Sequence, residues 1–216
     1  MGDPDHVEDP VDRLLSADYA RQQAQAVRTA VDTRQPIALE FDAFDQTDTV
    51  NISSVDAAGN LVALTLTHGD AFGARVSVPG LGLTLGHGIS RFDPSPGFPN
   101  SLAPGKRPLN NMCPSIVVRG GRPMIAIGGS GGRRIPSALC GTLLAYAGDG
   151  RSLQAAIDGP RLHAEGDRRL DLDDRWEADA ESYLVALGYE ASHANIANLS
   201  AVAVDRESGS FSACFR

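Results

Sequence analysis

The feature that most constrains the fold is a pair of strand-like segments that begins abruptly at Thr49. Residues 50–55 and 61–67 are rich in apolar and β-branched side chains, and residues 56–60 between them read Asp-Ala-Ala-Gly-Asn. Gly and Asn at the end of that link tolerate the positive φ angles of a tight turn. The pattern therefore predicts an antiparallel hairpin, with Thr49 at its open end and Thr67 opposite.

Two further hairpins are expected along the chain. One joins strands at 115–119 and 124–127 through a turn at 120–123, and the other joins 199–205 to 211–215 around Ser208-Gly209. Helical patterns cover about 10–31, where Ser16 or Asp18 could cap a second helix, and also 136–147, 152–158 and 177–187. Hairpins with helices inserted between them predict an α+β fold, in which antiparallel sheets carry helices on their outer faces. Residues 68–111 read as a long ordered loop, with one strand fragment near 81–85.

The composition excludes several classes of function. The chain has 216 residues and 42% hydrophobic content, which is enough for one substantial core. No run of 18 apolar residues exists, so no membrane span is expected. The net charge is −8, and the part after residue 48 is nearly neutral without a basic stripe. Nucleic-acid binding is therefore not expected.

The N-terminal run MGDPDHVEDPVDRLL is acidic and lacks the apolar segment of a signal peptide, which favours a cytoplasmic location. Its first ten residues are polar, with two prolines, and are expected to be disordered. The cysteines (Cys113, Cys140 and Cys214) and the five histidines are scattered without metal-ligand spacing. We therefore expect buried free thiols, no metal and no cofactor.

Two stretches stand out for chemistry. The run Gly128-Gly-Ser-Gly-Gly132 lies between a predicted strand and a predicted helix, so it is either a tight turn or an oxyanion hole of backbone amides. The adjacent Asn110 and Asn111 lie between two prolines, where they either form turns or present amides to a ligand. The sequence spacing supports no Ser/His/Asp triad, and His163 and His193 have no evident nucleophile partner. The carboxylates of 171–174 read as a surface turn.

These runs resemble a known family. DTVNISSVDAAGNLVALTLT from Asp48, PGKRPLNNMCPSIVV from Pro104 and GGSGGRRI from Gly128 are similar to the small-subunit sequence of γ-glutamyltransferases. DPVDRLLSADYA and DGPRLHAEG are also similar, and the likeness is collinear from about residue 9 to 206. It implies an N-terminal-nucleophile hydrolase with an αββα sandwich, made as a precursor that cuts its own chain before a threonine.

In the resemblance, Thr49 takes the position of that threonine, so the chain would be cut between residues 48 and 49. Residues 1–48 would then be the remnant of a large-subunit end, and residues 49–216 the catalytic portion. The free α-amine of Thr49, with a pKa of ~7.7–8.0, would act as the base, and its Oγ would attack an amide carbonyl. Thr67 matches the threonine that hydrogen-bonds the nucleophile. Gly131 and Gly132 match the pair whose amides form the oxyanion hole.

The substrate-binding positions depart from the family pattern. Asn110 and Asn111 replace two serines that bind the substrate α-carboxylate, and Gly69 replaces an asparagine. Arg91 replaces the acidic residue that recognises the glutamyl α-ammonium, so it should repel an ammonium and favour a carboxylate. Glutathione is therefore not the expected substrate. Acylases, amidohydrolases of small carboxylates and hydrolases of carbon–carbon bonds remain open.

The family's large subunit is longer than this whole chain, whereas 48 residues precede Thr49 here. The missing half of the sandwich would leave apolar sheet surface exposed. We therefore expect association with a large-subunit partner or self-association. Two hypotheses remain. In the first, the chain is an autoprocessed amide hydrolase or acyltransferase acting on a small molecule. In the second, it is a non-catalytic remnant or split subunit.

Overall fold

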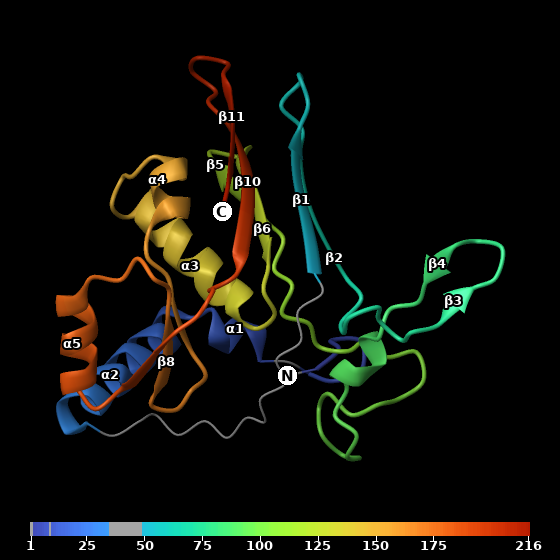
Figure 1. Cartoon of the computed structure of the whole chain (residues 1–216), viewed down its shortest axis with the longest axis horizontal. Coiled ribbons are helices and arrows are strands. Elements are labelled where there is room, and N and C mark those ends of the chain that lie inside the picture. The colour runs from blue at the N-terminus through green and yellow to red at the C-terminus, as the bar shows by residue number, and fades with distance from the viewer. Residues whose placement is uncertain (1, 9, 35–48) are drawn as a thin grey trace.

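The computed structural model describes residues 2–8, 10–34 and 49–216 (Figure 1). The described helices are α1 (Val11–Leu14), α2 (Ala17–Thr33), α3 (Arg134–Ala147), α4 (Leu153–Asp158), α5 (Ala178–Ala186) and the 3₁₀ helix η1 (Gly88–Arg91). The described strands are β1 (Thr49–Val55), β2 (Leu61–Thr67), β3 (Ser77–Val78), β4 (Leu83–Thr84), β5 (Ser115–Arg119), β6 (Arg122–Ser130), β7 (Leu162–Ala164), β8 (Arg169–Leu172), β9 (Glu190–His193), β10 (Asn198–Val204) and β11 (Phe211–Phe215).

The centre of the molecule is a four-stranded antiparallel sheet in the order β11–β10–β6–β5. It consists of the two later hairpins predicted from the sequence. The β5–β6 turn is shorter than predicted, because β6 begins at Arg122 and only Gly120 and Gly121 connect the strands. Both of these glycines have positive φ, as a two-residue hairpin turn requires.

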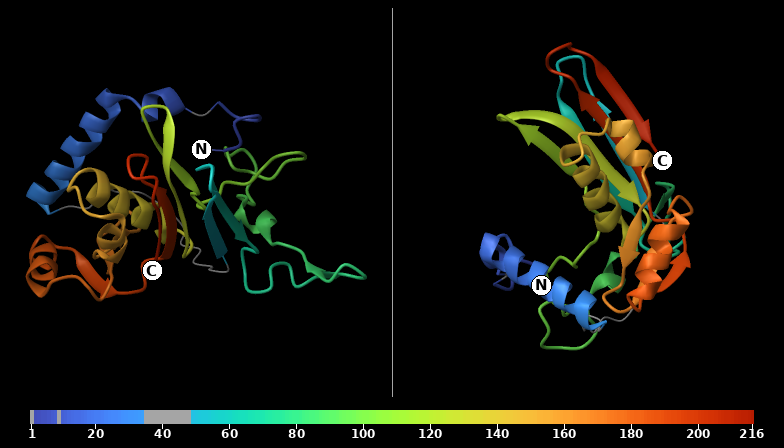
Figure 2. Two further views of the ribbon diagram at one scale, coloured as in Figure 1. Left: turned by 90° about the horizontal axis from the view of Figure 1, so that it is seen from above. Right: turned by 90° about the vertical axis from the view of Figure 1, so that its left-hand side faces the viewer.

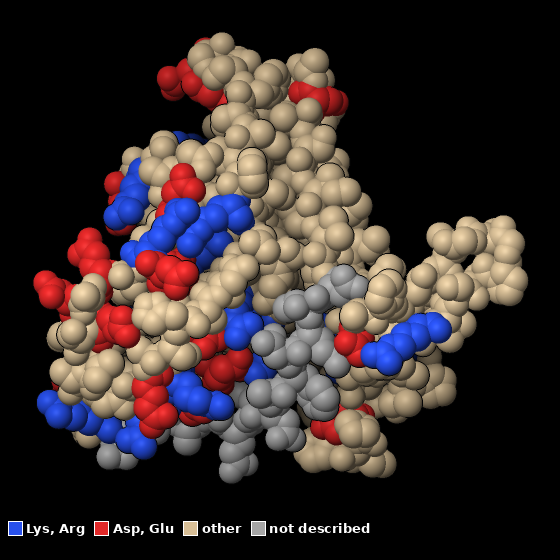
Figure 3. Space-filling view, viewed as in Figure 1, with Lys and Arg blue, Asp and Glu red and all other residues tan. Residues whose placement is uncertain are grey.

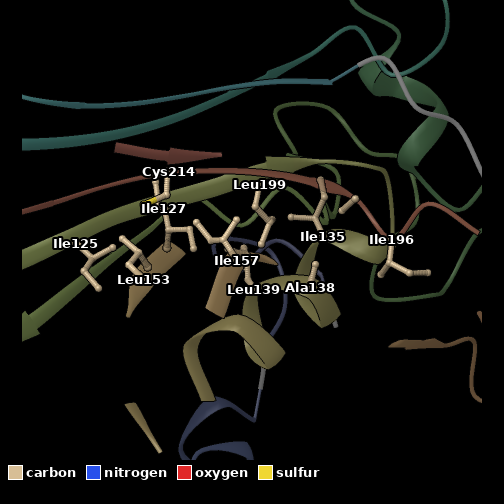
Figure 4. Close-up of a cluster of buried hydrophobic side chains, with 12 residues drawn as sticks. Ile125, Ile127, Ile135, Ala138, Leu139, Leu153, Ile157, Ile196, Leu199 and Cys214 are labelled. Atoms are coloured by element: carbon tan, nitrogen blue, oxygen red, sulfur yellow. The ribbon is translucent and has the colours of Figure 1, made fainter. Parts of the chain in front are cut away.

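The hydrophobic core lies between one face of this sheet and helices α3 and α4 (Figure 4). Ile125 and Ile127 point from β6 into the core, and both are fully buried. Ile135 of α3 and Ile157 of α4 meet them from the helical layer, also fully buried. Because these side chains come from both layers, the sheet and its helices form one packed unit.

The β1–β2 hairpin packs beside this sheet as a second layer, and its contact is polar (Figure 1). Asn51 Nδ2 donates to Ser200 Oγ of β10 at 2.7 Å, and Thr65 Oγ1 donates to Asn51 Oδ1 at 2.8 Å. Ser53 Oγ donates to the Ser200 carbonyl at 3.0 Å. A Cβ atom on Gly128 would lie 2.1 Å from Asn51 Oδ1, so only glycine admits this side chain. Residues 128–130, which were expected to form a loop, pair with β10 as the end of β6.

The strand directions place Thr49 at a defined end of the sandwich. At the opposite end, Arg206 Nη2 donates to the carbonyls of Gly59, at 2.9 Å, and Pro123, at 3.0 Å. The β1–β2 turn therefore lies beside the start of β6. Since Asn51 lies against Gly128 in mid-strand, the first residue of β1 lies at the same end as the last residue of β6.

A third sheet, β7–β8–β9, corrects the expectation that all sheets are antiparallel. β8 and β9 pair in parallel, and α5 connects them. A parallel pair needs such a crossover, because a tight turn cannot return the chain in the same direction. The helix predicted at 177–187 is therefore the connection of a small βαβ unit.

Residues 68–111 form the predicted long loop, with somewhat more structure than the one strand fragment expected. It contains the short pair β3–β4 and helix η1. This region extends away from the four-stranded sheet on the side of the hairpin's open end (Figures 1 and 2).

The N-terminal segment differs most from expectation. Residues 2–8, expected to be disordered, lie against the long loop, and Asp3 is only 4% exposed. The helical stretch divides into α1 and α2 because Ser16 caps α2, its side chain accepting from the Tyr19 amide at 3.1 Å. The cap was predicted, although α2 is longer than the short helix envisaged.

Two of the three cysteines are also placed differently from the prediction. Cys113 and Cys140 are exposed, and only Cys214 is buried. Burial raises the pKa of the Cys214 thiol. Within the described residues, no helix combines the length and the apolar character needed to cross a bilayer.

Candidate active site

Two threonine hydroxyls meet at the open end of the β1–β2 hairpin. Thr49 and Thr67 are direct cross-strand partners, and Thr49 Oγ1 donates to Thr67 Oγ1 at 3.1 Å. The Gly69 amide donates to the same Thr67 oxygen at 3.0 Å. The Thr67 hydroxyl is thus held from two sides and can fix the orientation of the Thr49 hydroxyl. The sequence predicted this juxtaposition from the hairpin alone.

Gly69 serves this arrangement through its backbone. Its φ of +86° is readily adopted only by glycine, and it turns the chain so that its amide points back at Thr67. A Cβ atom there would also lie 3.4 Å from the His87 carbonyl oxygen. The structure therefore places Gly69 next to the threonine pair as a backbone donor.

The Gly131–Gly132 turn lies at the same end of the sandwich, directly after β6. Both glycines have positive φ, +142° and +61°, and their carbonyls accept from Arg134 and Ile135 in the first turn of α3. Neither glycine amide donates a hydrogen bond to another described residue in this structure. Two amides at a helix N-terminus are suited to stabilising a developing oxyanion.

Gly131 is held against a second unusual residue, Ala197. A Cβ atom on Gly131 would lie 2.5 Å from Ala197 Cα, and Ala197 itself has a left-handed φ of +58°. Buried Arg161 fixes this contact: its Nη1 donates to the Ala197 carbonyl at 2.7 Å and to the Ile196 carbonyl at 3.3 Å. Burial lowers the pKa of the Arg161 guanidinium to about 10, so it stays charged at neutral pH.

Sequence reasoning missed the supporting role of Arg161 and misread Asp173. Asp173 was expected on a surface turn, yet it is 3% exposed. Its carboxylate accepts from the Arg161 amide at 2.9 Å and pairs with Arg216 at 2.8 Å. The available signal was the run DGPRLHAEG, which contains Arg161, but no local pattern links it to residue 173.

The predicted substrate-binding residues lie on two loops that Asn100 connects. Asn100 Nδ2 donates to the Arg91 carbonyl at 2.7 Å, and its Oδ1 accepts from the Leu109 amide at 3.0 Å. Arg91, at the end of η1, is thereby tied to the segment carrying Asn110 and Asn111. In the described structure no hydrogen bond joins these three side chains to Thr49.

The two asparagines differ in their hydrogen bonding. Asn110 is exposed, and its Nδ2 donates weakly to the Pro108 carbonyl at 3.3 Å. Asn111 Nδ2 is buried without a hydrogen-bond partner among the described residues. Turn formation alone therefore does not account for Asn111, because a buried donor is costly unless something satisfies it.

The structure also assembles a Ser–His–Glu chain that the sequence did not reveal. His163 Nδ1 lies 2.8 Å from Ser137 Oγ, its Nε2 lies 3.1 Å from Glu165 Oε1, and Glu165 pairs with Arg133. His163 is only 6% exposed, and Ser137 lies within α3, where the helix occupies the neighbouring backbone amides. Without oxyanion donors, this chain is a structural link between α3 and β7.

The wider family is identified by comparison with known proteins. A family model described as Gamma-glutamyltranspeptidase matches residues 1–214. Glutathione hydrolase proenzyme of Bacillus subtilis (strain 168) is 28% identical and covers 97% of this chain. Acylase ACY 1 proenzyme of Pseudomonas sp. (strain V22) is 34% identical and covers 87%.

A solved structure agrees with these sequences. Gamma-glutamyltranspeptidase from Pseudomonas nitroreducens, complexed with L-DON, superposes with a TM-score of 0.69 at 27% identity, over 76% of this chain and 93% of that chain. The chain spans 39% of the length of the B. subtilis proenzyme and 33% of that of the acylase. This chain thus belongs to the γ-glutamyltranspeptidase family and has its N-terminal-nucleophile hydrolase fold.

Proposed function

We propose that this chain is the catalytic portion of an autoprocessed amide hydrolase or acyltransferase, in which Thr49 is the nucleophile. The observation that carries the proposal is the Thr49–Thr67 hydroxyl pair, 3.1 Å apart at the start of β1. The cut would fall before Thr49 and divide the chain into a leader, residues 1–48, and a catalytic portion, residues 49–216. Asp48, on the other side of that bond, lies outside the described residues.

The mechanism follows from the groups around Thr49. After the cut, its α-amine takes the proton from its own Oγ, since an α-amine with a pKa of ~7.7–8.0 is partly unprotonated near neutral pH. The Oγ attacks the substrate carbonyl, while Thr67 holds the hydroxyl in line. The Gly131 and Gly132 amides would receive the oxyanion. The leaving amine takes the proton from the α-ammonium, and water or another amine then releases the acyl group from the Thr49 ester.

The substrate class follows from the charge at the binding loops. Arg91 stands where the family resemblance places an acid that recognises an α-ammonium, and Asn110 and Asn111 stand where it places carboxylate-binding serines. A cation with two amides favours an acyl group that carries a carboxylate and no ammonium. One relative is named as a glutathione hydrolase and another as an acylase, and the positive charge of Arg91 favours an acylase-like substrate.

A matched pair of chromogenic amides tests this function. γ-Glutamyl-p-nitroanilide and glutaryl-p-nitroanilide share acyl chain length, carboxylate and leaving group, and they differ only in the α-ammonium. We expect kcat/KM to be higher for the glutaryl compound, and Arg91→Asp to reverse the order. Thr49→Ala should abolish both activities. Equal turnover by Thr49→Ala would refute the nucleophile, whereas preference for the γ-glutamyl compound would refute only the substrate class.

We also propose that a large-subunit polypeptide or a second copy of the chain covers the outer face of the β1–β2 hairpin. Its side chains Val50, Ile52, Val62, Leu64 and Leu66 are each more than half exposed. A continuous apolar face of this kind in water favours association. The greater length of the curated relatives supports a covering polypeptide.

A further inference from the structure

Among the described residues of the leader, Asp3 is the one whose side chain is buried in the rest of the protein. In the catalytic portion its carboxylate binds Arg107, which donates from its backbone amide to Oδ2 at 2.7 Å and from Nη2 to Oδ1 at 2.6 Å. Within the leader, the Asp5 amide donates to Oδ1 at 3.2 Å. Arg107 Nε lies 3.2 Å from both carboxylate oxygens. Arg107 Nη2 also pairs with Asp5 at 2.5 Å. A buried carboxylate held by this many charge-assisted bonds is a specific contact.

The segment around Asp3 fits the loop closely. A Cβ atom on Gly2 would lie 2.1 Å from the Pro99 carbonyl oxygen, so the leader backbone lies directly against the loop. The same Pro99 oxygen accepts from Lys106 Nζ at 2.6 Å. The loop from 99 to 107 thus folds around Gly2 and Asp3 and continues into the segment that carries Asn110 and Asn111.

The remainder of the described leader is more loosely attached. α2 has no buried residue, and its C-terminal end approaches α5 (Figure 2). Its Gln23 and Val31 line a hollow of about 520 Å³ together with residues of α5, including Tyr183. In the described leader only Gly2 and Asp3 are buried. The firm attachment is therefore at its N-terminal end, far in sequence from the proposed cut.

We propose that Asp3 and Arg107 form an anchor that keeps the leader bound to the catalytic portion after the chain is cut, and that holds the Asn110–Asn111 loop in place from across the cut. The anchor rests on the proposed function insofar as it needs a cut between Asp3 and Arg107. After the cut, the leader would supply the Asp3 carboxylate and the catalytic portion would supply Arg107 and its loop, so the contact would join the two cleavage products.

The test uses a full-length Thr49→Ala chain with a specific protease recognition sequence placed within residues 35–48. External protease makes the cut, so the result does not depend on self-cleavage or on Thr49 chemistry. The rate at which the leader leaves is followed by size-exclusion chromatography and denaturing gels after dilution. We expect Asp3→Asn and Arg107→Gln each to raise this rate about ten- to a hundredfold. The effect of the double variant should fall short of the sum of the two, because both weaken the Asp3–Arg107 contact, although Arg107→Gln also removes the pair with Asp5.

Asp18→Asn is the matched control. Asp18 pairs with Arg21 within α2, so this variant removes a leader carboxylate and an ion pair without touching the catalytic portion. In this variant the leader should be released at the same rate as in the parent chain. Equal release by the Asp3→Asn and Asp18→Asn variants, or additive effects of Asp3→Asn and Arg107→Gln, would overturn the anchor.

A second readout on the uncut chain tests the effect on the loop. Hydrogen exchange of the segment 100–112 should accelerate in Asp3→Asn and stay unchanged in Asp18→Asn, because the Arg107 amide is bonded to the Asp3 carboxylate. Unchanged exchange in Asp3→Asn, with circular dichroism matching the parent, would show that the loop does not depend on the leader.

Discussion

Two sheet faces of this molecule have opposite surroundings. The face of the four-stranded sheet that carries Ile125 and Ile127 is covered by α3 and α4, and both side chains are 0% exposed. The outer face of the β1–β2 hairpin carries Ile52 and Leu64, which are 54% and 52% exposed. On the face shown in Figure 3, charged side chains gather over the helical half, and the hairpin carries few of them. The chain thus covers one face of its four-stranded sheet with its own helices, but it leaves the apolar outer face of the β1–β2 hairpin exposed.

The hairpin also reverses the usual distribution of polarity in a two-layer protein. Its inner face carries a polar cluster, with Asn51, Ser53 and Thr65 bonded to one another or to Ser200, whereas its outer face is largely apolar. The inner network fixes the hairpin on β6 and β10 and so fixes Thr49. The outer face is suited to a covering layer. The candidate site and the proposed association surface are therefore the two sides of the same pair of strands.

The largest expected difference is in stability. Ile127→Ala should lower the free energy of unfolding by about 2–5 kcal/mol, because it opens a cavity between the sheet and its helices. Ile52→Ala should cost less than about 1 kcal/mol in the isolated chain, because its side chain is already in water. Urea denaturation of both variants measures the contrast. Equal losses would show that the hairpin face is covered by something in the isolated protein.

The Gly131 turn provides the next largest effect. Gly131→Ala should cost about 1–3 kcal/mol of strain, because its φ is positive and its Cβ would contact Ala197. It should also impair the cut before Thr49, since the amide donors would move. Gly141→Ala is the control: a Cβ atom there has open space within α3, so this variant should be neutral or slightly stabilising. Thermal unfolding measures the loss of stability, and mass spectrometry measures the extent of the cut before Thr49.

Changing the outer face should weaken association without unfolding the hairpin. Ile52 and Leu64 are cross-strand partners, so Ile52→Lys with Leu64→Glu replaces an apolar pair by an opposite-charge pair. We expect a shift towards monomer in sedimentation velocity, or loss of a co-expressed large-subunit partner. Ser54→Ala alters the same face without removing an apolar group or adding a charge, and should change association little. A monomeric parent chain that binds no partner would contradict the association surface.

The smallest effect concerns pH. Hydrogen bonds from Arg107 hold the pKa of the Asp3 carboxyl well below its usual value. Because the pKa of Asp3 is lowered in the folded protein, its ionised carboxylate contributes fully to leader binding above the pKa of an unfolded aspartate, ~3.9. That contribution is lost as the pH falls through the lowered pKa. Leader retention should therefore be constant from neutral pH to about 4 and decline below it. Asp3→Asn should remove this component of the acid dependence.

The hairpins were predictable because alternation and turn residues are local signals, and the Thr49–Thr67 pair followed from the first of them. The polar inner face of that hairpin was not predictable, because it depends on Ser200. Gly128 was read as a loop residue, although it lies in a strand and makes room for Asn51. The Asp3–Arg107 contact joins residues 104 positions apart, beyond the reach of any periodic pattern.

The central claim is that Thr49 is a nucleophile exposed by a cut before it, and intact mass tests it most directly. The purified parent chain, co-expressed with a large-subunit partner where one is needed for folding, is compared with Thr49→Ala and Thr49→Ser. The account predicts two fragments divided between residues 48 and 49 in the parent and, more slowly, in Thr49→Ser, with a single uncut mass in Thr49→Ala. Identical masses for the parent and Thr49→Ala under both conditions would contradict it.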